Sequence, residues 1–485
     1  LALVAPKVED ASGRSRFHAP RRVRLSSPSR FPAPDSSRMA AAAAKGKPLG
    51  ELTSGGRALR SETRLYFRVS DLRKGNFVNP SHATPANQLV ESVARSAIEA
   101  GTLGRVDALR LLEASRQSSG LEALTEAAFE SKTQGKGDVI TVSRNVFLPL
   151  TNLCRNRCTY CGFAKQPDSP EAHTYTLDEV SEVVRGGVKT GCTEALMCLG
   201  DKPEIAYKRY REWMAETGYE STIDLVHEAC EVALEGGMLP HTNAGIMTGE
   251  EMQRLRPLNA SMGLMMENVS PRLRQKGMPH FHAPDKDPAR RIRMHEEAGE
   301  LKIPFTTGIL LGIGENDEER IDTLLKIRSI HERYGHIQEV IVQPFHPKHD
   351  TPMRSQETIS DNEVIAWVAL TRLIMGPEMN IQAPPNLAPE MLSRLARAGL
   401  NDWGGVSLVT VDFINPEAPW PAIDGLRDLT RSSGQKLRDR GPIYPDWLLG
   451  RPEFFDSDMH ESALRLATDE GYARRPHHQS KEEAA

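Results

Sequence analysis

The sequence predicts an α/β fold, a closed (β/α)8 barrel of the TIM type. Eight short apolar runs with the composition of strands recur between residues 146 and 408, and helix-like segments separate them. Strands that alternate with helices form parallel βα units, and eight such units close a barrel. The expected strands span residues 146–150, 194–199, 239–243, 261–267, 305–311, 339–345, 381–384 and 404–408.

The segments between these runs carry the start and stop signals of helices. Thr176 with Glu179, and Thr248 with Glu251, have the spacing of the capping box, which satisfies the first backbone amides of a helix. Apolar residues over 177–188 recur on one helical face. Gly335 stands where a glycine in the left-handed conformation would end a helix. We therefore expect these segments to be the helices of the βα units.

The length and composition suit a large globular protein with extensions. The chain has 485 residues and is 39% hydrophobic, which is enough for one large barrel or for two ordinary domains. We expect four parts: a disordered or transit-like tail over 1–60, a helical N-terminal extension over 61–137, the barrel over 138–420, and a C-terminal helical segment with a mobile tail over 421–485.

The first sixty residues are rich in Arg, Ser, Ala and Pro, a composition typical of a transit peptide. Met39 opens a plausible second start, so translated upstream sequence with a disordered tail is an equal alternative. The few cysteines show no disulfide framework, which indicates a reducing intracellular compartment. We expect the cytoplasm, or a plastid or mitochondrion if the tail is a transit peptide.

The charge pattern predicts neither a nucleic-acid partner nor a membrane. The formal net charge is -4, and basic and acidic residues are interspersed rather than gathered into a basic surface. No stretch approaches the roughly 20 apolar residues that a membrane-spanning helix needs.

Three cysteines follow the first expected strand. Cys154, Cys158 and Cys161, in TNLCRNRCTYCGF, have the spacing Cys-x3-Cys-x2-Cys. Iron–sulfur clusters are normally closed by four thiolates, so three compact ligands can hold a [4Fe-4S] cluster with one iron open to a non-protein ligand. A structural zinc site is the alternative, but such sites usually have a second cysteine pair, and none follows here. The remaining cysteines are scattered among apolar residues and are expected in the core: Cys192, Cys198 and Cys230.

Polar residues end several of the later runs. In a barrel of this type, functional residues gather at the carboxyl ends of the strands, which meet at one mouth. Loop capping is the alternative for any single residue. The residues at these ends are Asn243, Glu267, Gln343, His346 and Asn386.

The cysteine run resembles the signature of the radical S-adenosylmethionine (SAM) superfamily. The resemblance implies a [4Fe-4S] cluster whose open iron is chelated by the amine and carboxylate of SAM, and an electron that cleaves SAM to a 5'-deoxyadenosyl radical. It also implies an aromatic residue beside the adenine, a turn after the second strand at the SAM amine, an acidic residue near the ribose, and an arginine for the carboxylate. The turn here, LGDKPE, departs from the Gly-Gly-Glu form. With the end of the third strand included, the implied SAM-binding residues are Tyr160, Gly200, Glu204, Asn243, Glu267, and Arg272 or Arg274.

Beyond the cysteines the resemblance becomes more specific. The segments SRNVFLPLTNLCRNRCTYCGFAK, EALMCLGDKPE, LPHTNAGIMTGEEM, SMGLMMENVSPRL and GHIQEVIVQPFHPK follow the order found in the CofG-type radical SAM component of 7,8-didemethyl-8-hydroxy-5-deazariboflavin synthases. This implies a carbon–nitrogen lyase that cyclises the 5-amino-5-(4-hydroxybenzyl)-6-ribitylimino-uracil adduct to the deazaflavin with loss of ammonia. Only one Cys-x3-Cys-x2-Cys run is present, so a sister radical SAM enzyme is expected to supply the adduct in trans, and ferredoxin or flavodoxin to supply electrons.

These arguments identify no acid–base residue. His346 and His349 are hypotheses for deprotonation or for holding the ribityl chain, and Asp285 is a hypothesis for a uracil contact. The alternative reactions are that of the sister hydroxybenzyl transferase and a sulfur insertion of the biotin-synthase type, which needs a second cluster for which no grouped cysteines remain. A non-catalytic iron–sulfur or zinc-binding protein is the alternative of another class.

Overall fold

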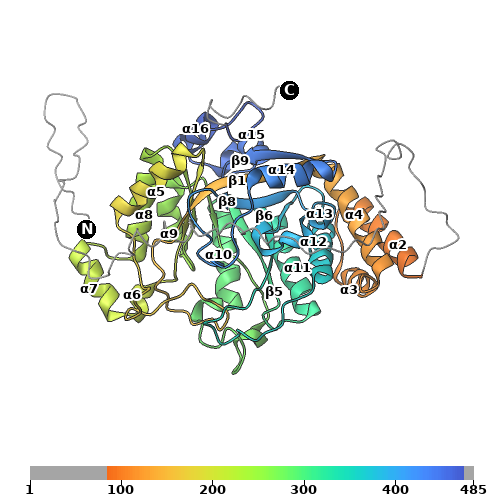
Figure 1. The fold of residues 1–485 in the computed structure, drawn as a ribbon, viewed down its shortest axis with the longest axis horizontal. Coiled ribbons are helices and arrows are strands. Elements are labelled where there is room, and N and C mark those ends of the chain that lie inside the picture. Colours follow the sequence, from red (N-terminus) through yellow and green to blue (C-terminus); the bar gives the residue numbers. More distant parts are fainter. Residues whose placement is uncertain (1–84, 475–485) are drawn as a thin grey trace, which may run out of the picture.

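Parallel strands form a closed barrel at the centre of the molecule, and the computed structural model describes residues 85–474 of it (Figure 1). β1 pairs with β8 on one side and β2 on the other, which closes the ring of β1 to β8 in sequence order. The predicted (β/α)8 fold is therefore confirmed. The strands are β1 (Val139–Leu148), β2 (Glu194–Cys198), β3 (Leu239–Asn243), β4 (Ser261–Gly263), β5 (Phe305–Leu311), β6 (Ile337–Pro344), β7 (Asn380–Gln382), β8 (Asp402–Ser407) and β9 (Lys436–Arg440).

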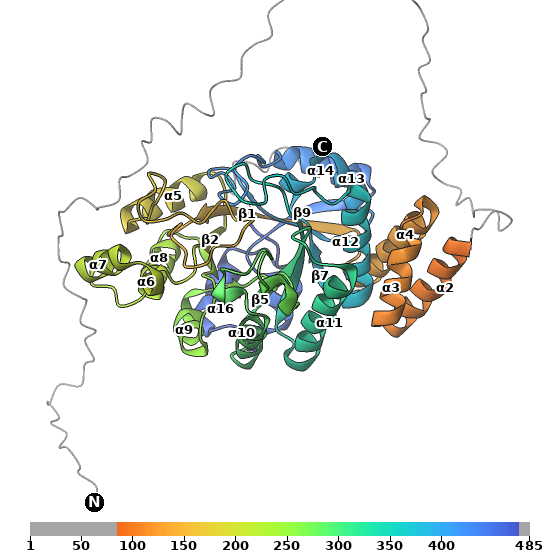
Figure 2. The same cartoon turned by 90° about the horizontal axis from the view of Figure 1, so that it is seen from below.

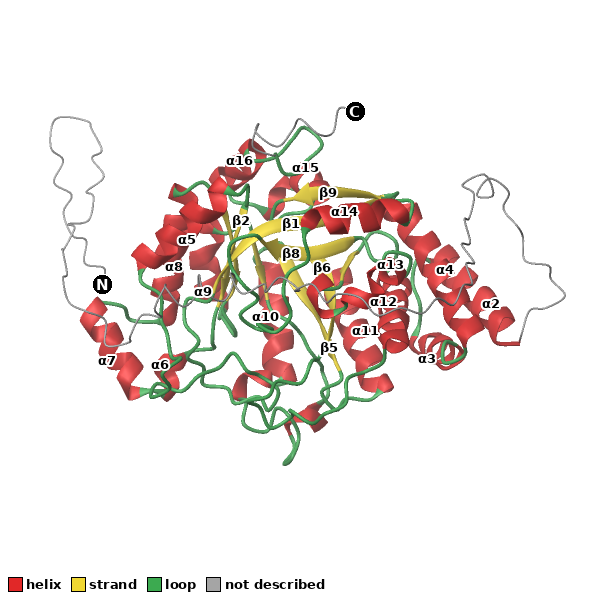
Figure 3. Ribbon diagram, in the orientation of Figure 1, coloured by secondary structure: helices red, strands yellow, loops and turns green. Residues whose placement is uncertain are grey.

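Helices surround the ring of strands (Figure 3). Both expected capping boxes are present, because Thr176 and Thr248 each accept a hydrogen bond from the backbone amide three residues later. Gly335 has φ of 68° and ends the longest of the barrel helices, as expected. The main helices of the barrel are α5 (Leu177–Lys189), α8 (Thr222–Glu235), α9 (Gly249–Leu255), α10 (Pro288–Glu300), α11 (Asp317–Tyr334), α12 (Asp361–Met375) and α14 (Ile423–Ser432).

Two strands differ from the predicted ranges for identifiable reasons. β1 begins seven residues earlier than expected, because its polar Ser143 and Arg144 are buried and paired: Ser143 donates to Glu194, and Arg144 Nε lies 3.0 Å from Asp439. β4 is shorter than expected, although backbone hydrogen bonds to β5 continue at Leu264 and Glu267. Glu267 has a left-handed φ of 60°, which ends the extended run.

β9 is a strand in the segment that was expected to be helical. It pairs in parallel with the first half of β1, from Val139 opposite Lys436 to Ser143 opposite Arg440. Its sequence, KLRDR, has the composition of a solvated surface, but Leu437 and Arg440 are buried. Favourable partners for its charges come from distant segments, so the local sequence did not indicate a strand.

Three N-terminal helices pack against the barrel and share its main apolar core. They are α2 (Pro85–Ala100), α3 (Arg105–Ala114) and α4 (Ser118–Lys136), and they lie together beside α12 (Figure 2). Leu111 and Leu124 are fully buried in the same apolar cluster as Trp367 of α12. The part of the extension from residue 85 onward is therefore helical. The tail expected over 1–60 and the end of the chain after residue 474 lie outside the described residues.

A C-terminal segment covers the amino ends of the strands. α15 (Pro445–Gly450) and α16 (Ser457–Arg465) build a separate apolar cluster with Leu239, the first residue of β3. The Pro442 carbonyl accepts hydrogen bonds from Ser261 Oγ at 2.9 Å and from Gln338 Nε2 at 3.1 Å. The barrel is therefore closed at this end and its interior is reached from the other. None of the helices over residues 85–474 has the length and hydropathy to cross a membrane.

The buried guanidinium of Arg372 on α12 gives a test of this packing. It donates to the carbonyls of Gly399 at 2.9 Å and Gly376 at 3.0 Å and to Asn401 Oδ1 at 2.7 Å, and burial lowers its pKa to about 9. We expect Arg372→Met to leave several buried acceptors unpaired and to lower the free energy of unfolding by about 3 kcal/mol or more. Urea denaturation followed by circular dichroism measures this change. Arg431→Met, at an exposed arginine, is the control, and equal losses for the two variants would contradict the assignment.

Candidate active site

A cavity of about 390 Å³ lies inside the barrel and opens at the carboxyl ends of the strands. Alternate residues of a strand point to the same face, so each strand contributes a short column of side chains to the wall. The columns run from polar residues at the closed end, through apolar residues, to polar residues at the mouth. On β2 and β6 these columns are Glu194, Leu196 and Cys198, and Glu339, Ile341 and Gln343. The cavity therefore has a polar floor, an apolar waist and a polar mouth.

The three cysteines of the Cys-x3-Cys-x2-Cys run all line this cavity. Cys154 Sγ accepts hydrogen bonds from the backbone amides of Asn156 at 3.4 Å and Asp201 at 3.2 Å. Burial raises the pKa of Cys154 and of Cys158 to about 12, so iron has to displace protons when it binds these thiols. Over residues 85–474, no three His, Cys, Asp or Glu side chains converge on a point that could hold one metal ion.

Arg155, inside the cysteine run, fixes this loop to two other segments. Its Nε lies 2.8 Å from Asp201 Oδ2, after β2, and 2.7 Å from Asp285 Oδ2, in the segment before α10. Burial and the neighbouring Asp285 raise the pKa of Asp201 to about 7. The sequence analysis did not single out Arg155, because an arginine among other charged residues gives no signal of burial. Asp285 is 1% exposed and paired with Arg155, so the structure gives no support to its hypothetical uracil contact.

Gly200 brings the turn after β2 against the cysteine loop. A Cβ atom at this position would lie 2.0 Å from the Leu153 carbonyl oxygen and 2.9 Å from the Cys154 Cβ. The Gly200 amide donates to the Thr151 carbonyl at 2.9 Å. Only glycine allows this approach, and it leaves Gly200 on the cavity wall beside Cys154.

Glu267 lies at the centre of a buried group of charges at the mouth. It accepts a hydrogen bond from Tyr160 Oη at 2.7 Å, pairs with Lys286, and lies 3.4 Å from His280 Nε2 and 3.9 Å from Arg291 Nη1. Burial alone would raise the pKa of Glu267, but Lys286, Arg291 and His280 outweigh burial and hold it well below the usual value. Glu267 is therefore ionised at neutral pH, with two cations beside it that also line the cavity.

Of the other residues implied as SAM contacts, some line the cavity and some do not. Asn243, at the end of β3, lines the cavity. Glu204 does not line it; its carboxylate accepts a hydrogen bond from Thr222 Oγ1 at 2.6 Å on the outer side of the turn.

Arg272 and Arg274 also lie outside the cavity wall. Arg272 Nη2 lies 2.6 Å from Glu319, and Arg274 Nη1 lies 2.6 Å from Asp287. Both arginines are thus used by neighbouring carboxylates. Neither Glu204 nor these arginines gains support from this arrangement as a SAM ligand.

Gln343 and Asn386 line the cavity, whereas the two histidines of FHPKHD do not. The side chain of His346 is bonded to the Leu387 carbonyl, 2.9 Å away, and His349 is exposed. Cys198 also corrects an expectation. It was expected in the core with Cys192 and Cys230, which are indeed buried there, but its thiol lines the cavity.

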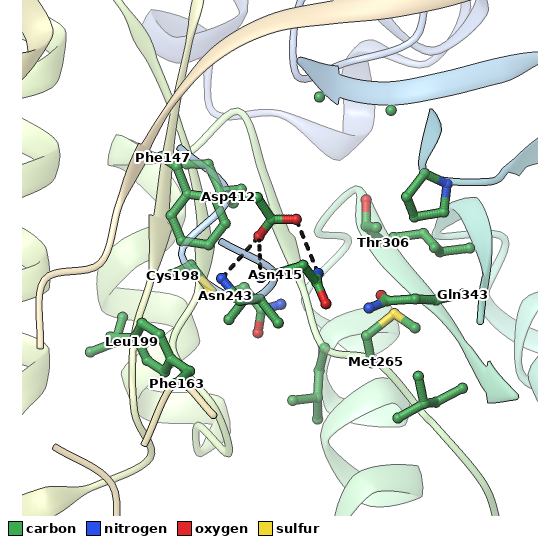
Figure 4. A pocket seen from close by; sticks show the side chains of 18 of the residues that line it. Phe147, Phe163, Cys198, Leu199, Asn243, Met265, Thr306, Gln343, Asp412 and Asn415 are labelled. Atoms are coloured by element: carbon green, nitrogen blue, oxygen red, sulfur yellow. Dashed lines mark hydrogen bonds between the residues drawn. The ribbon is translucent and has the colours of Figure 1, made fainter. Parts of the chain in front are cut away.

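The loop between β8 and α14 supplies a further part of the wall. Asp412 is buried and accepts hydrogen bonds from Asn386 Nδ2 at 2.9 Å and Asn415 Nδ2 at 3.0 Å. Figure 4 shows Asp412 and Asn415 between Phe147, on one side of the cavity, and Gln343, on the other. No motif marked this loop, because its partners come from elsewhere in the chain.

Comparison with known proteins agrees with this geometry. Residues 148–327 match the family model of the Radical SAM superfamily. The chain is 47% identical over 337 residues to the 7,8-didemethyl-8-hydroxy-5-deazariboflavin synthase of Methanopyrus kandleri, which covers 69% of this chain and 100% of that one. It is 42% identical over 396 residues to the FO synthase of Streptomyces coelicolor, covering 79% of this chain but only 44% of that protein. The chain thus spans less than half the length of that relative.

Solved structures share the fold at low identity. The [FeFe]-hydrogenase maturase HydG superimposes with a TM-score of 0.62 at 16% identity, over 80% of this chain and 83% of that chain. Methylornithine synthase (PylB) superimposes with a TM-score of 0.56 at 20% identity, over 71% of this chain and 97% of that chain. Together with the identity to the archaeal synthase over its whole length, these findings place the chain in the 7,8-didemethyl-8-hydroxy-5-deazariboflavin synthase family of radical SAM enzymes.

Proposed function

We propose that this enzyme cyclises the 5-amino-5-(4-hydroxybenzyl)-6-ribitylimino-uracil adduct to 7,8-didemethyl-8-hydroxy-5-deazariboflavin, with loss of ammonia. The observation that carries the proposal is the placement of Cys154, Cys158 and Cys161 on the wall of one barrel cavity, in a chain that matches a deazaflavin synthase over that protein's full length. A sister radical SAM enzyme in trans supplies the adduct, and a ferredoxin or flavodoxin supplies electrons.

The residues present fit a [4Fe-4S] cluster. Three thiols line one cavity, and three protein ligands leave one iron of such a cluster open. The Arg155 pairs with Asp201 and Asp285 hold the loop in place, and two backbone amides already point at Cys154 Sγ. Such outer partners orient metal ligands and tune the centre that they hold.

The residues at the mouth also fit SAM. The backbone of Gly200 on the cavity wall, the amide of Asn243 and the ionised carboxylate of Glu267 offer acceptors to an ammonium group or to ribose hydroxyls. Lys286 and Arg291 lie on the same wall, where Lys286 pairs with Glu267 and Arg291 donates to the carbonyls of Asp285 and Met265, so both balance the charge of Glu267. When bound, the cluster and SAM supply a 5'-deoxyadenosyl radical.

The chain itself contributes enclosure and orientation. Phe147, Leu196 and Ile341 form the apolar waist, which excludes water and suits the hydroxybenzyl ring of the adduct. The closed floor leaves one direction of entry. The cavity therefore holds the substrate in a fixed position for the reaction. Positioning of the substrate is the main contribution that a protein makes to cofactor chemistry of this kind.

Replacement of one cluster ligand tests the cofactor site. We expect anaerobically reconstituted Cys158→Ala to hold iron and sulfide with an affinity lower by about tenfold or more, because even outer partners of metal ligands contribute that much. Iron and sulfide assays and the visible absorption of the cluster measure this loss. Cys230→Ala, at a buried thiol away from the cavity, should keep the full cluster. Full cluster content in Cys158→Ala would argue against this ligand.

Turnover tests the reaction. With dithionite, SAM and the hydroxybenzyl-aminouracil adduct, we expect 5'-deoxyadenosine and the fluorescent deazaflavin to form together, and both to be absent with Cys158→Ala. Tyrosine with 5-amino-6-ribitylaminouracil should give neither product, and consumption of tyrosine would assign the sister reaction instead. A protein with an intact cluster that forms 5'-deoxyadenosine but no deazaflavin would refute the proposed substrate.

A further inference from the structure

The floor of the cavity is built from side chains of several strands and is remote from the cysteines in sequence. Asn145 on β1, Glu194 on β2, Glu339 on β6 and Gln382 on β7 line it, and Arg440 of β9 closes it from below. Every one of these residues is buried. So many polar groups in a barrel interior need partners, since an unpaired buried polar atom is costly.

The single arginine of this floor is already used. Arg440 donates to both carboxylate oxygens of Asp402, through Nε at 2.6 Å and Nη2 at 2.8 Å, and its Nη2 lies 3.5 Å from Glu339. Of the described residues that line the floor, Arg440 is the only Lys or Arg. With three carboxyl groups nearby, including Glu194, the floor offers no free cation to a phosphate or another anion.

Two amide oxygens of the floor have no hydrogen-bond partner. Asn145 Oδ1 and Gln382 Oε1 are unpaired, although the two residues are only 3% and 5% exposed. Their positions are fixed by two glycines of β8. A Cβ atom on Gly404 would lie 2.2 Å from Gln382 Nε2, and one on Gly405 would lie 2.1 Å from Asn145 Nδ2. The absence of a side chain at the two glycines thus leaves room for the amide groups of Asn145 and Gln382. An unpaired buried acceptor lowers the free energy of unfolding by about 1–3 kcal/mol.

The titratable groups of the floor favour a neutral ligand. Burial raises the pKa of Glu339 to about 7 and also raises the pKa of Glu194. Burial lowers the pKa of His241, which also lines the cavity, to about 3, so its ring is neutral. Thr306 Oγ1 donates to Glu339 Oε2 at 3.1 Å and so uses one of its oxygens. The floor thus combines neutral amides with carboxyl groups of raised pKa and offers no free cation.

We propose that this floor is the subsite for a neutral polyhydroxylated chain, with the side-chain amides of Asn145 and Gln382 forming hydrogen bonds to its hydroxyl groups. The inference rests on the proposed function, in which the substrate carries a ribityl chain. It places that chain at the closed end of the barrel, away from His346 and His349. A chain that ends in a phosphate ester is rejected, because Arg440 is already paired with Asp402 and no other Lys or Arg of the described residues lines the floor.

Binding of the fluorescent product gives a test that does not depend on turnover. The probes are 7,8-didemethyl-8-hydroxy-5-deazariboflavin, its N10-methyl analogue without the ribityl chain, and its chain phosphate ester. They are titrated anaerobically into the reconstituted enzyme with SAM present. We expect the ribityl compound to bind at least about tenfold more tightly than the other two, a difference of about 1.4 kcal/mol.

Variants test whether the floor causes the tighter binding of the ribityl compound. Gln382→Met keeps the size of the side chain but removes the acceptor, and it should weaken binding of the ribityl compound about tenfold, as the loss of one buried hydrogen bond implies. Binding of the N10-methyl analogue should not change, which shows that the variant is folded. Gln382→Glu keeps an acceptor oxygen and should retain the preference for the chain. Gln253→Met, at an exposed glutamine outside the cavity wall, is the control and should behave as the wild type.

The possible failures are distinct. Equal affinity of the wild type for the ribityl and N10-methyl compounds, or an unchanged preference in Gln382→Met, would overturn the subsite, since water would then satisfy these acceptors. Turnover of the adduct could still be intact in that case. If neither deazaflavin binds to an enzyme with an intact cluster, and no product forms, the proposed function itself fails and the subsite fails with it.

Discussion

The double pairing of β1 is the constraint on which the barrel and its cavity depend. One edge of this strand pairs with β8, while the other pairs with β9 along its first half and with β2 along its second half. The first half therefore carries the closed end of the barrel, where β9 brings Arg440 beneath the cavity. The second half completes the ring and delivers the chain to the cysteine loop at the open end. A ten-residue strand thus fixes both the floor and the mouth.

Both ends of the cavity rely on arginines held between carboxylates. Arg155 joins Asp201 to Asp285 at the mouth, and Arg440 lies between Asp402 and Glu339 at the floor. Buried ion pairs of this kind are weak evidence of stability, because desolvation offsets much of their attraction. Their value here is geometric, since a guanidinium with two carboxylate partners has few alternative positions. The loop with the cluster ligands and the floor beneath the substrate are held by the same device.

Much of the fold followed from the sequence, because local patterns determined it. β3 and β5 have the predicted bounds, and the capping boxes at Thr176 and Thr248 are formed, since apolar runs and caps depend on neighbours along the chain. β9 could not be predicted, because its buried charges, Asp439 and Arg440, pair with residues of β1, β6 and β8 that are distant in the sequence. Arg155 and the amides of Asn145 and Gln382 were not predicted as site residues for the same reason: their neighbours come from distant parts of the chain.

The candidate site, like the fold, could be predicted where local sequence was sufficient and not where it depended on distant residues. The spacing of the cysteines was sufficient to find the loop, and the rule that function gathers at strand ends led to Asn243 and Glu267. Arg272 and Glu204 were implied by the family resemblance, and each has a closer partner outside the cavity. Whether a charged side chain is free depends on which carboxylates or hydroxyls the fold brings near it. That information is not present in a short motif.

The layered wall of the cavity also determines the orientation of a long ligand. From Glu194 to Cys198 the wall rises by four residues of β2, which is about 13 Å at the spacing of a parallel strand. A molecule with a polyol at one end and aromatic rings at the other can satisfy the floor and the waist only in one direction. The reverse orientation would bury hydroxyl groups against Leu196 and Ile341 and leave the acceptors at the floor unpaired. Orientation is thus set at the closed end of the barrel, and the ring system of such a ligand lies toward the mouth, where the cysteine loop is.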